Sequence, residues 1–251
     1  MIHVTDRDGI RTLTIDRPPV NALNHEVLVA LSDALQAAPG EGARGLMLSG
    51  AGMLFTAGLD VRHVLSLDAV GLRAFLGTFF GCLQVLVRSP IPVVAALNGA
   101  SPAGGAVLAL CCDWRVMARG AGRIGLNEVQ VGLFPGAFIA TLLSRCVGER
   151  KAGHLLLSGA LLSPADAFAC GLVDELADPE SLHATACTWL EGCLAAPPQA
   201  FAMTRRLLRK DMIKAAEAMD GAALDALVEA WMAPEARAML QAVTAKRKPA
   251  P

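Results

Sequence analysis

A single carboxylate, Glu128, stands in an otherwise uncharged and largely apolar segment of the chain. It is the only charged residue between Arg123 and Arg145, within the sequence GRIGLNEVQVGLFPG at 122–136. A carboxylate buried among apolar groups is poorly solvated, which raises its pKa and makes its ionised form a stronger base. The sequence context alone leaves two alternatives, an exposed acid on a surface loop or a buried proton acceptor.

Two short glycine-containing turns follow predicted strands and offer backbone donors to an anion. They are FTAGLD at 55–60 and NGASPAGG at 98–105. In the second turn Pro102 suits the first turn of a helix, where the next N–H groups have no partner within the helix. Gly104 has no side chain, so a ligand atom can approach its backbone closely. Such donors suit an enolate oxygen, whereas the alternative is that the glycines only allow tight packing of a helix on a strand.

Other chemistries lack the residue patterns that they require. Neither turn matches GxGxxG or GxxxxGK[ST], so a dinucleotide site or a phosphate-binding loop has little support. Ser101 has no histidine or aspartate at a diagnostic spacing, which disfavours a serine-hydrolase triad. The seven cysteines form no CxxC pair and share no metal-ligand spacing with the five histidines. We therefore expect reduced, buried thiols and no metal site.

The composition predicts a large apolar core and no pronounced charge. The chain has 251 residues, 54% of them hydrophobic, and a formal net charge of −1. This charge gives little support for nucleic acid as a partner. The N-terminal MIHVTDRDGI lacks the basic and apolar regions of a signal peptide, and no run of about 18 uncharged apolar residues predicts a membrane span. We expect a cytoplasmic protein with no membrane partner.

Predicted strands and helices alternate over the first half of the chain. The predicted strands lie at 2–5, 11–16, 44–50, 91–99 and 113–118. The predicted helices lie at 25–38, 68–88 and 102–112. A turn at Asp6–Gly9 joins the first two strands, and 51–64 is expected to be a glycine-punctuated turn. This alternation predicts parallel strand pairing and an α/β fold.

The chain beyond Pro197-Pro198 contains helix-forming residues and no strand pattern. We therefore expect a core at 1–196 and a C-terminal helical region at 197–251. Three packing arrangements are open for this region: on its own core, on a neighbouring subunit, or on both. The basic segment TRRLLRK at 204–210 is interpreted as the polar face of one of its helices.

Five segments, in the same order along the chain, resemble the crotonase (enoyl-CoA hydratase/isomerase) superfamily. They are RPPVNALN, FTAGLD, IPVVAALNGASPAGGAVLALCCDWRVMA, IGLNEVQVGLFPG and LLSPADAFACGLVDEL. The ordered set is specific and covers nearly the whole chain. The resemblance is strongest to the mitochondrial-type Δ3,Δ2-enoyl-CoA isomerases, through Ala57–Asp60, Asn98–Gly105 and Gly125–Glu128. It implies a crotonase-like spiral of ββα units with a C-terminal helical appendage that takes part in subunit contacts, in a homotrimer or a dimer of trimers.

The resemblance also implies a site for an acyl-CoA thioester. No separate cofactor is expected, because coenzyme A is part of the substrate. By motif position, the backbone N–H groups of Leu59 and Gly104 would hold the thioester oxygen, and Glu128 would be the catalytic base. The other substrate-binding residues expected from the motifs are Ala57, Gly58, Asp60 and Asn127. For Asp60, a hydrogen bond to its own turn is the simpler role.

Val107 separates two candidate reactions, because two-glutamate hydratases of the superfamily carry their first glutamate at this position. Hydrating a trans-2-enoyl thioester needs a base to activate water and an acid to protonate the α-carbon. Moving a double bond from C3 to C2 needs only one group, which removes a proton from C2 and returns it at C4. We therefore predict an enoyl-CoA isomerase in which Glu128 is the single proton shuttle.

Two alternatives stay open. Pro135-Gly136 resembles the hydratase branch, so a hydratase or another thioester-enolate reaction on the same scaffold is the nearest alternative. A non-catalytic binding member of the superfamily is more remote, and 204–210 would be its only candidate basic helix. For Arg62, His63 and the basic AKRKP at 245–249, contact with CoA phosphates competes with a solvated surface or a frayed tail. The Phe79-Phe80 pair is interpreted as core packing, and a place at the border of the acyl pocket is the alternative.

Overall fold

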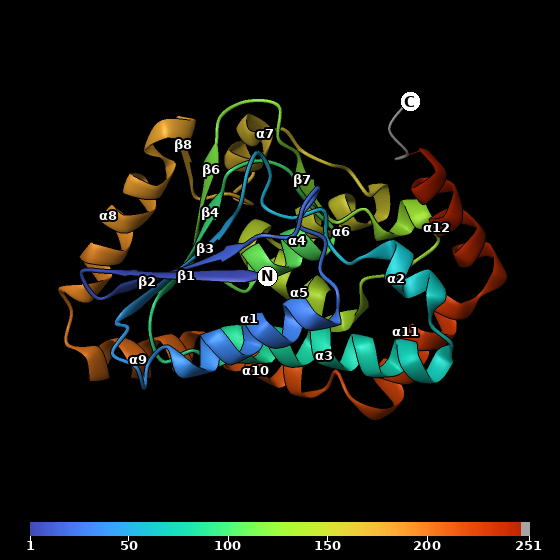
Figure 1. Ribbon diagram of the computed structural model, residues 1–251, viewed down its shortest axis with the longest axis horizontal. Helices are drawn as coiled ribbons and strands as arrows, with labels where there is room; N and C mark the ends of the chain where they lie inside the picture. Colours follow the sequence, from blue (N-terminus) through green and yellow to red (C-terminus); the bar gives the residue numbers. More distant parts are fainter. Residues whose placement is uncertain (247–251) are drawn as a thin grey trace.

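The computed structural model describes residues 1–246 and contains a six-stranded sheet with helices on both faces (Figure 1). In their order across the sheet, the strands are β1 (Ile2–Arg7), β2 (Ile10–Ile15), β3 (Gly45–Gly50), β4 (Val93–Leu97), β6 (Trp114–Ala118) and β8 (Glu175–Ala177). β1 is antiparallel to β2, and every other neighbouring pair is parallel. The predicted α/β class with parallel pairing is confirmed.

The opening hairpin turns more tightly than we predicted. Asp8 and Gly9 have φ angles of +52° and +79°, which suit a two-residue turn whose twist matches that of the strands. Arg7 therefore pairs directly with Ile10. The first strand extends into the predicted turn at Asp6–Gly9, because the Asp-Gly pair alone reverses the chain.

Helices account for most of the remaining chain. They are α1 (His25–Ala37), α2 (Val61–Ser66), α3 (Ala69–Arg88), α4 (Gly104–Leu110), α5 (Gly136–Val147), α6 (Glu149–Ser158), α7 (Pro164–Ala169), α8 (Leu182–Leu194), α9 (Pro198–Leu208), α10 (Lys210–Glu217), α11 (Gly221–Met232) and α12 (Pro234–Lys246), with short 3₁₀ turns η1 (Glu128–Val131) and η2 (Pro179–Ser181). The predicted helices at 25–38 and 68–88 are confirmed as α1 and α3. The helix predicted at 102–112 is observed as α4, but the placement of Pro102 in its first turn was wrong, because Pro102 lies in a short strand and the helix begins at Gly104.

Sequence patterns missed α2, β8 and a small parallel pair formed by β5 (Ser101–Pro102) and β7 (Ile124–Gly125). The expectation of an unbroken turn over 51–64 was wrong at its end, because the Asp60 side chain caps a short helix. Each of these elements is too short to show a hydrophobic period.

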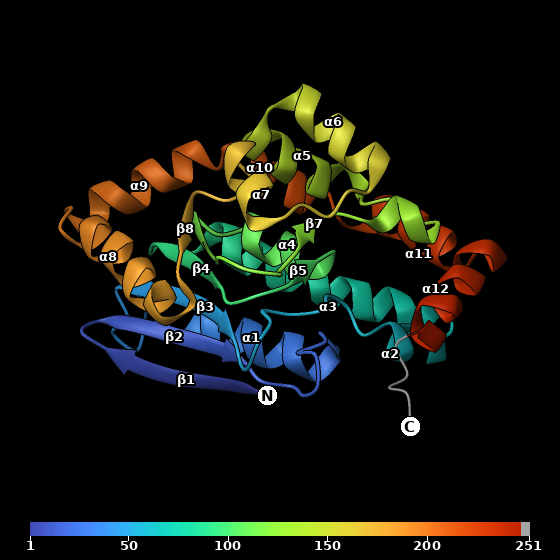
Figure 2. The ribbon, with the colours of Figure 1, turned by 90° about the horizontal axis from the view of Figure 1, so that it is seen from above.

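Helices lie against both faces of the sheet (Figure 2), and an apolar cluster fills the space on each side. On one face α1 and α3 contribute to the main core, in which Leu28, Leu31 and Leu83 are fully buried. On the other face α8 covers β3, β4 and β6, and its Leu182 and Leu190 pack in a second cluster. The parallel strands are thus buried on both faces, which accounts for their continuous apolar runs.

α3 is the one helix within residues 1–246 that is long and apolar enough to cross a membrane by length and composition. The criterion of about 18 uncharged apolar residues does not select this helix, because Arg73 interrupts the run. Nine of its side chains are buried in the fold, and the helix contacts α1, α10 and α11. Packing inside the protein therefore accounts for its apolar composition.

The C-terminal helices continue the main core. Met212 and Ala216 of α10 and Leu224 and Leu227 of α11 are buried in it. α12 packs on α2, where a guanidinium nitrogen of Arg237 donates to the carbonyl oxygen of Leu65 at 2.5 Å. Packing on the chain's own core is thus observed, while subunit contacts and a trimer stay predictions. Residues 247–251, and with them most of the basic AKRKP segment, lie outside the described residues.

The interpretation of 204–210 as a polar helix face was wrong for Arg205 and Arg209, which are 5% and 6% exposed. Arg205 donates to Asp113 and to three carbonyl oxygens at the end of α3, those of Leu86, Val87 and Ser89. Arg209 donates to Asp113 at 2.7 Å and to the carbonyl oxygen of Cys111 at 2.6 Å. These arginines satisfy helix C-termini and fasten the C-terminal helices to the core.

Candidate active site

The small β5–β7 pair brings the second glycine turn next to the Glu128 segment. Ser101 pairs with Ile124 and Pro102 with Gly125. The N–H of Ala103 then donates to the carbonyl oxygen of Gly125 at 2.8 Å. As a result, α4 begins beside the strand whose continuation leads into Glu128.

The first glycine turn, at 55–60, is fastened to the same place. Gly58 accepts a hydrogen bond from the N–H of Leu23 at 2.9 Å, and the N–H of Asp60 donates to the carbonyl oxygen of Leu23 at 2.9 Å. The φ angle of Gly58 is +85°, and a Cβ atom there would lie 3.1 Å from the backbone nitrogen of Gly104. Both the conformation and the space therefore require glycine at 58.

Leu59 and Gly104 present their backbone N–H groups close together. A Cβ atom on Gly104 would lie 3.2 Å from the nitrogen of Leu59. Among residues 1–246 neither N–H has a hydrogen-bond acceptor. Ala103, directly before Gly104, has a φ angle of +48°, a sparsely populated conformation of the kind that clusters at functional sites. Two free donors in this arrangement can bind one oxygen atom that carries negative charge.

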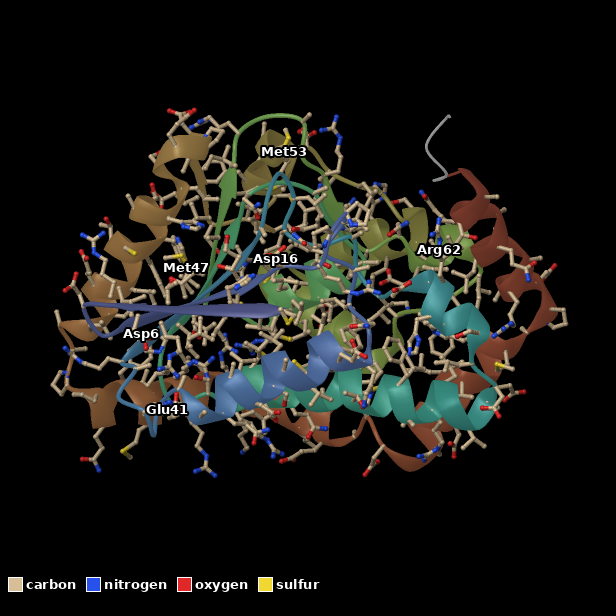
Figure 3. All side chains as sticks on the ribbon, viewed as in Figure 1. Asp6, Asp16, Glu41, Met47, Met53 and Arg62 are labelled. Atoms are coloured by element: carbon tan, nitrogen blue, oxygen red, sulfur yellow. The ribbon has the colours of Figure 1, made fainter. Side chains whose placement is uncertain are left out.

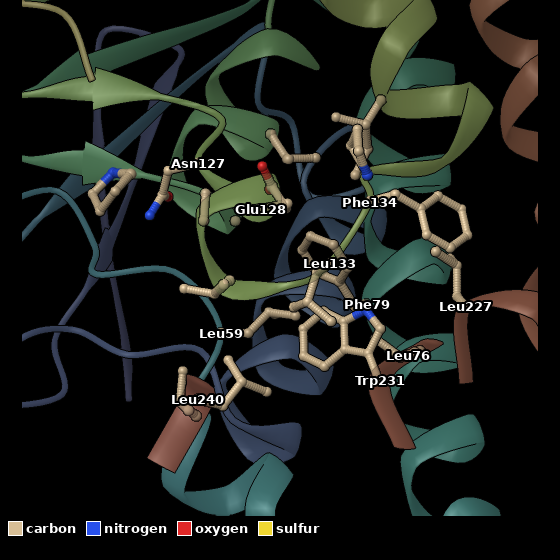
Figure 4. A pocket seen from close by; sticks show the side chains of 18 of the residues that line it. Leu59, Leu76, Phe79, Asn127, Glu128, Leu133, Phe134, Leu227, Trp231 and Leu240 are labelled. Atoms are coloured by element: carbon tan, nitrogen blue, oxygen red, sulfur yellow. The ribbon is translucent and has the colours of Figure 1, made fainter. Parts of the chain in front are cut away.

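Glu128 lies in the wall of a cavity, with much of its side chain buried (Figure 4). Its Oε2 atom is buried and has no hydrogen-bond partner among the described residues. Burial raises the pKa of the Glu128 carboxyl to about 7, and a hydrogen bond from its own backbone N–H offsets only part of the increase. The placement agrees with a buried proton acceptor and not with an exposed surface acid.

The cavity has a volume of about 160 Å³ and is mostly apolar. Leu59, Gly104 and Glu128 all border it. The other lining residues are Ala57, Val61, Leu76, Phe79, Phe80, Pro102, Ala103, Val107, Asn127, Val131, Leu133, Phe134, Pro135, Ile139, Leu161, Leu227, Trp231, Leu240 and Val243. The cavity thus joins one carboxylate, two free main-chain donors and an apolar lining that suits a hydrocarbon chain.

The remaining predicted site residues divide into two groups. Ala57 and Asn127 line the cavity. Gly58 and Asp60 do not line it: Gly58 provides the positive φ angle of the 55–60 turn, and the side chain of Asp60 caps α2. The Asp60 carboxylate accepts from two N–H groups at the start of α2 and forms an ion pair with Arg17 at 2.8 Å. This supports the simpler structural role for Asp60, and its contact with substrate stays a prediction.

Val107 stands in the cavity wall and is 1% exposed. The position at which a hydratase would carry its first glutamate is therefore apolar and dry in this chain. Arg62 is exposed on α2 (Figure 3), and the ring of His63 packs against Phe75 with centroids 5.2 Å apart. CoA contacts by Arg62 and His63 stay predictions.

Sequence reasoning missed the lining contributed by the C-terminal helices. Leu227 and Trp231 of α11 and Leu240 and Val243 of α12 border the cavity. Phe79 and Phe80 were assigned to the core and belong to both the core and the cavity wall. An apolar helix face has the same period in either environment, so the sequence contains no signal that separates them.

The thiols and the other metal-ligand types form no second centre within the described chain. All seven cysteines are free, and Cys82, Cys111 and Cys112 are buried while the other four are partly exposed. Cys111 and Cys112 belong to the main core, whereas the expectation of buried thiols was wrong for the four partly exposed ones. Within residues 1–246 no group of three or more His, Cys, Asp or Glu side chains is arranged to hold a metal ion.

Comparison with known proteins identifies the class to which this fold and site belong. Residues 5–250 match the enoyl-CoA hydratase/isomerase family, and the chain belongs to it. The structure resembles that of human mitochondrial Δ3-Δ2-enoyl-CoA isomerase with a TM-score of 0.94, covering 98% of this chain and 97% of that one at 28% identity. The protein is therefore an enzyme family member with the crotonase fold, as predicted.

Relatives with different reactions are similar to the chain to the same degree. The mouse mitochondrial enoyl-CoA delta isomerase 1 is 33% identical over 217 residues, which cover 84% of this chain and 75% of the relative. A probable enoyl-CoA hydratase of Bacillus subtilis is 33% identical over 247 residues, covering 96% and 94%. Sequence similarity thus places the chain among enoyl-CoA isomerases and hydratases without separating the two reactions. The choice between these reactions rests on the residues of the site.

Proposed function

We propose that the protein is a Δ3,Δ2-enoyl-CoA isomerase that uses Glu128 as its single proton shuttle. One observation carries this proposal: among residues 1–246 the cavity contains a single carboxylate, that of Glu128, whose buried Oε2 has no hydrogen-bond partner, and it has a valine, Val107, at the position where hydration requires a second acid. Leu59 and Gly104 supply the oxyanion hole across the same cavity. The acyl-CoA substrate is the kind of molecule on which this enzyme family acts.

The reaction needs no group beyond these residues and the substrate. Glu128 removes a proton from C2 of a 3-enoyl thioester, and the electron pair delocalises into the thioester carbonyl and the C3–C4 double bond. The N–H groups of Leu59 and Gly104 stabilise the resulting dienolate oxygen, each contributing roughly 3 kcal/mol to the barrier reduction. Protonated Glu128 then returns the proton at C4, which leaves the double bond between C2 and C3 and consumes no water.

The acidity of Glu128 suits both halves of this cycle. A group whose pKa is about 7 accepts a proton at neutral pH and gives it back without a large free-energy difference. The apolar lining excludes water from the dienolate, which suppresses competing hydration. CoA enters as part of the substrate, and we propose no other cofactor.

Hydration is the second candidate, favoured by the Pro135-Gly136 pair, of which Pro135 lines the cavity, and by hydratase relatives. Valine at 107 neither orients water nor donates a proton, so we expect slow hydration at most. Incubation with trans-2-enoyl-CoA tests this directly, because hydration removes the conjugated enone absorbance. Rapid loss of that absorbance would favour the hydratase.

Replacement of Glu128 by glutamine tests the proposed function. Glu128→Gln keeps the shape of the side chain and removes the base, so turnover of 3-enoyl-CoA should fall at least 100-fold. Glu180→Gln is the matched control, because Glu180 is exposed in η2 and lies outside the cavity. Isomerase turnover within tenfold of wild type in Glu128→Gln, a barrier change below about 1.4 kcal/mol, would contradict the assignment.

A further inference from the structure

The cavity that holds Glu128 is small for a fatty acyl chain. Its volume is about 160 Å³. An engineered apolar cavity of about 150 Å³ in another protein binds benzene, a molecule of six carbon atoms. By this measure the space holds an acyl chain of about six carbons, and a longer chain must extend out of the cavity or displace its lining.

The wall formed by α3 belongs to the packed core. Leu76, Phe79 and Phe80 are 2%, 3% and 4% exposed. The rings of Phe79 and Phe80 lie 5.4 Å apart, and that of Phe80 lies 6.5 Å from the ring of Phe138. Side chains packed on both sides resist displacement, because moving them opens voids or forces strained rotamers elsewhere. This wall therefore fixes one limit of the cavity.

The wall formed by α11 is held less tightly. Trp231 is only partly buried and packs against both the main core and the small cluster of Leu133, Ala236 and Leu240. In Figure 4 its indole lies beside Phe79 and Leu133, with Glu128 farther along the cavity. Trp231 thus closes the cavity from the side of the C-terminal helices and occupies space that a longer chain would need.

We propose that the enzyme is specific for short acyl chains of about six carbons, and that Phe79 and Trp231 set this limit. The inference rests on the proposed isomerase function. Each methylene group buried in the cavity increases affinity about fourfold. Affinity therefore rises with chain length until the cavity is full, and additional methylenes then leave the apolar lining without a gain in affinity or displace packed side chains at a cost.

The test is a series of 3-enoyl-CoA substrates of six, eight, ten and twelve carbons. For the wild type, kcat/KM should fall at least tenfold from six to twelve carbons. Trp231→Leu should raise the twelve-to-six ratio at least tenfold, and Phe79→Leu should raise it from the α3 side. Phe168→Leu is the matched control, because Phe168 is 50% exposed on α7, outside the cavity. Equal wild-type turnover of six and twelve carbons, or unchanged ratios in both folded cavity variants, would overturn the inference.

Binding of saturated acyl-CoA by calorimetry separates this inference from the proposed reaction. Wild-type affinity should increase up to about six carbons and then level off or fall, whether or not catalysis occurs. Length-limited binding without turnover of any 3-enoyl-CoA would refute the isomerase function and support the size limit. Turnover combined with affinity that keeps rising to twelve carbons would refute the size limit alone. If neither cavity variant folds, the wild-type length dependence decides the question.

Discussion

Burial of Glu128 lowers the stability of the folded protein at neutral pH and makes the carboxylate a stronger base. Its pKa is raised to about 7 from a model-compound value of 4.5, and burial is the main cause. At neutral pH the folded protein therefore holds a carboxylate that water would solvate better. A buried, unpaired polar atom is normally costly, and enzymes keep such atoms where the substrate supplies the missing partner.

The raised pKa predicts how activity depends on pH. Below pH 7 Glu128 is protonated and cannot accept the C2 proton, so kcat/KM should rise about tenfold per pH unit toward 7 and level off above it. The measurement is a profile from pH 5 to 9 with a 3-enoyl-CoA, with circular dichroism at each pH to verify folding. An activity that stays constant from pH 5 to 8 would argue against Glu128 as the titrating base.

The same shift predicts a pH-dependent effect of Glu128→Gln on stability. A carboxyl group whose pKa is higher in the folded than in the unfolded state favours folding at low pH, and this contribution is lost as pH rises from about 4.5 through 7. Glu128→Gln should therefore raise the free energy of unfolding at pH 8 by about 1–3 kcal/mol and change it little at pH 4. Urea unfolding at both pH values measures the difference, and an equal effect at the two would contradict the shift.

Gly104 allows the oxyanion hole to be tested without changing a titratable group. A Cβ atom at Gly104 would lie 3.2 Å from the nitrogen of Leu59 and would crowd an oxygen bound as proposed between the two N–H groups. Gly104→Ala should lower kcat about 100-fold, the effect of losing one such donor. Gly153→Ala in α6 is the control, since a Cβ atom there meets nothing within 4 Å. Activity within threefold of wild type would argue against a role for this N–H.

At the scale of elements, short segments decide where the chemistry lies. β5 and β7 have two residues each, yet their pairing sets the start of α4 beside the segment of Glu128. Long elements such as α3 can be predicted because their apolar residues, nine of which are buried in α3, repeat at helical spacing. Two-residue strands have no period, so only long-range contacts reveal them.

Arg205 connects α9 to the end of α3 and gives a prediction at this scale. Its guanidinium donates to Asp113 and to the carbonyl oxygens of Leu86 and Val87 in the last turn of α3. Arg205→Ala should lower the free energy of unfolding by about 3 kcal/mol, because it leaves buried acceptors unsatisfied. Arg206→Ala, which changes an exposed neighbour on the same helix, should alter it by less than about 0.5 kcal/mol. Equal effects in urea unfolding would show that the buried network contributes little.

At the scale of the whole molecule, the cavity joins segments from most of the chain. Its lining extends from Ala57 to Val243 and includes α3, α4, α5, α11 and α12. Substrate bound in it therefore contacts elements that are far apart in the sequence. Filling the cavity should stabilise the fold as a unit and not just one loop.

This arrangement predicts a ligand effect on global stability. A non-reacting saturated hexanoyl-CoA at about 100 times its Kd should increase the free energy of unfolding by about 2.7 kcal/mol, or the Tm by roughly 5–10 °C. Proteolytic cleavage within α11 and α12 should slow in the same samples. Free CoA at the same concentration is the control, since it lacks the acyl chain. Unchanged cleavage in α11 and α12 despite a raised Tm would show that these helices do not contact the bound chain.

The sequence by itself determined the fold class, the main helices and strands, and the residues with reactive potential: Glu128, the two glycine turns and Val107. These depend on local patterns and on ordered motifs, which are written along the chain. Tertiary structure alone decided that Oε2 of Glu128 is buried without a partner, that two N–H groups are free and adjacent, and that α11 and α12 close the cavity. Those properties depend on distances between segments far apart in sequence, and an apolar helix face looks the same whether it meets a core or a ligand.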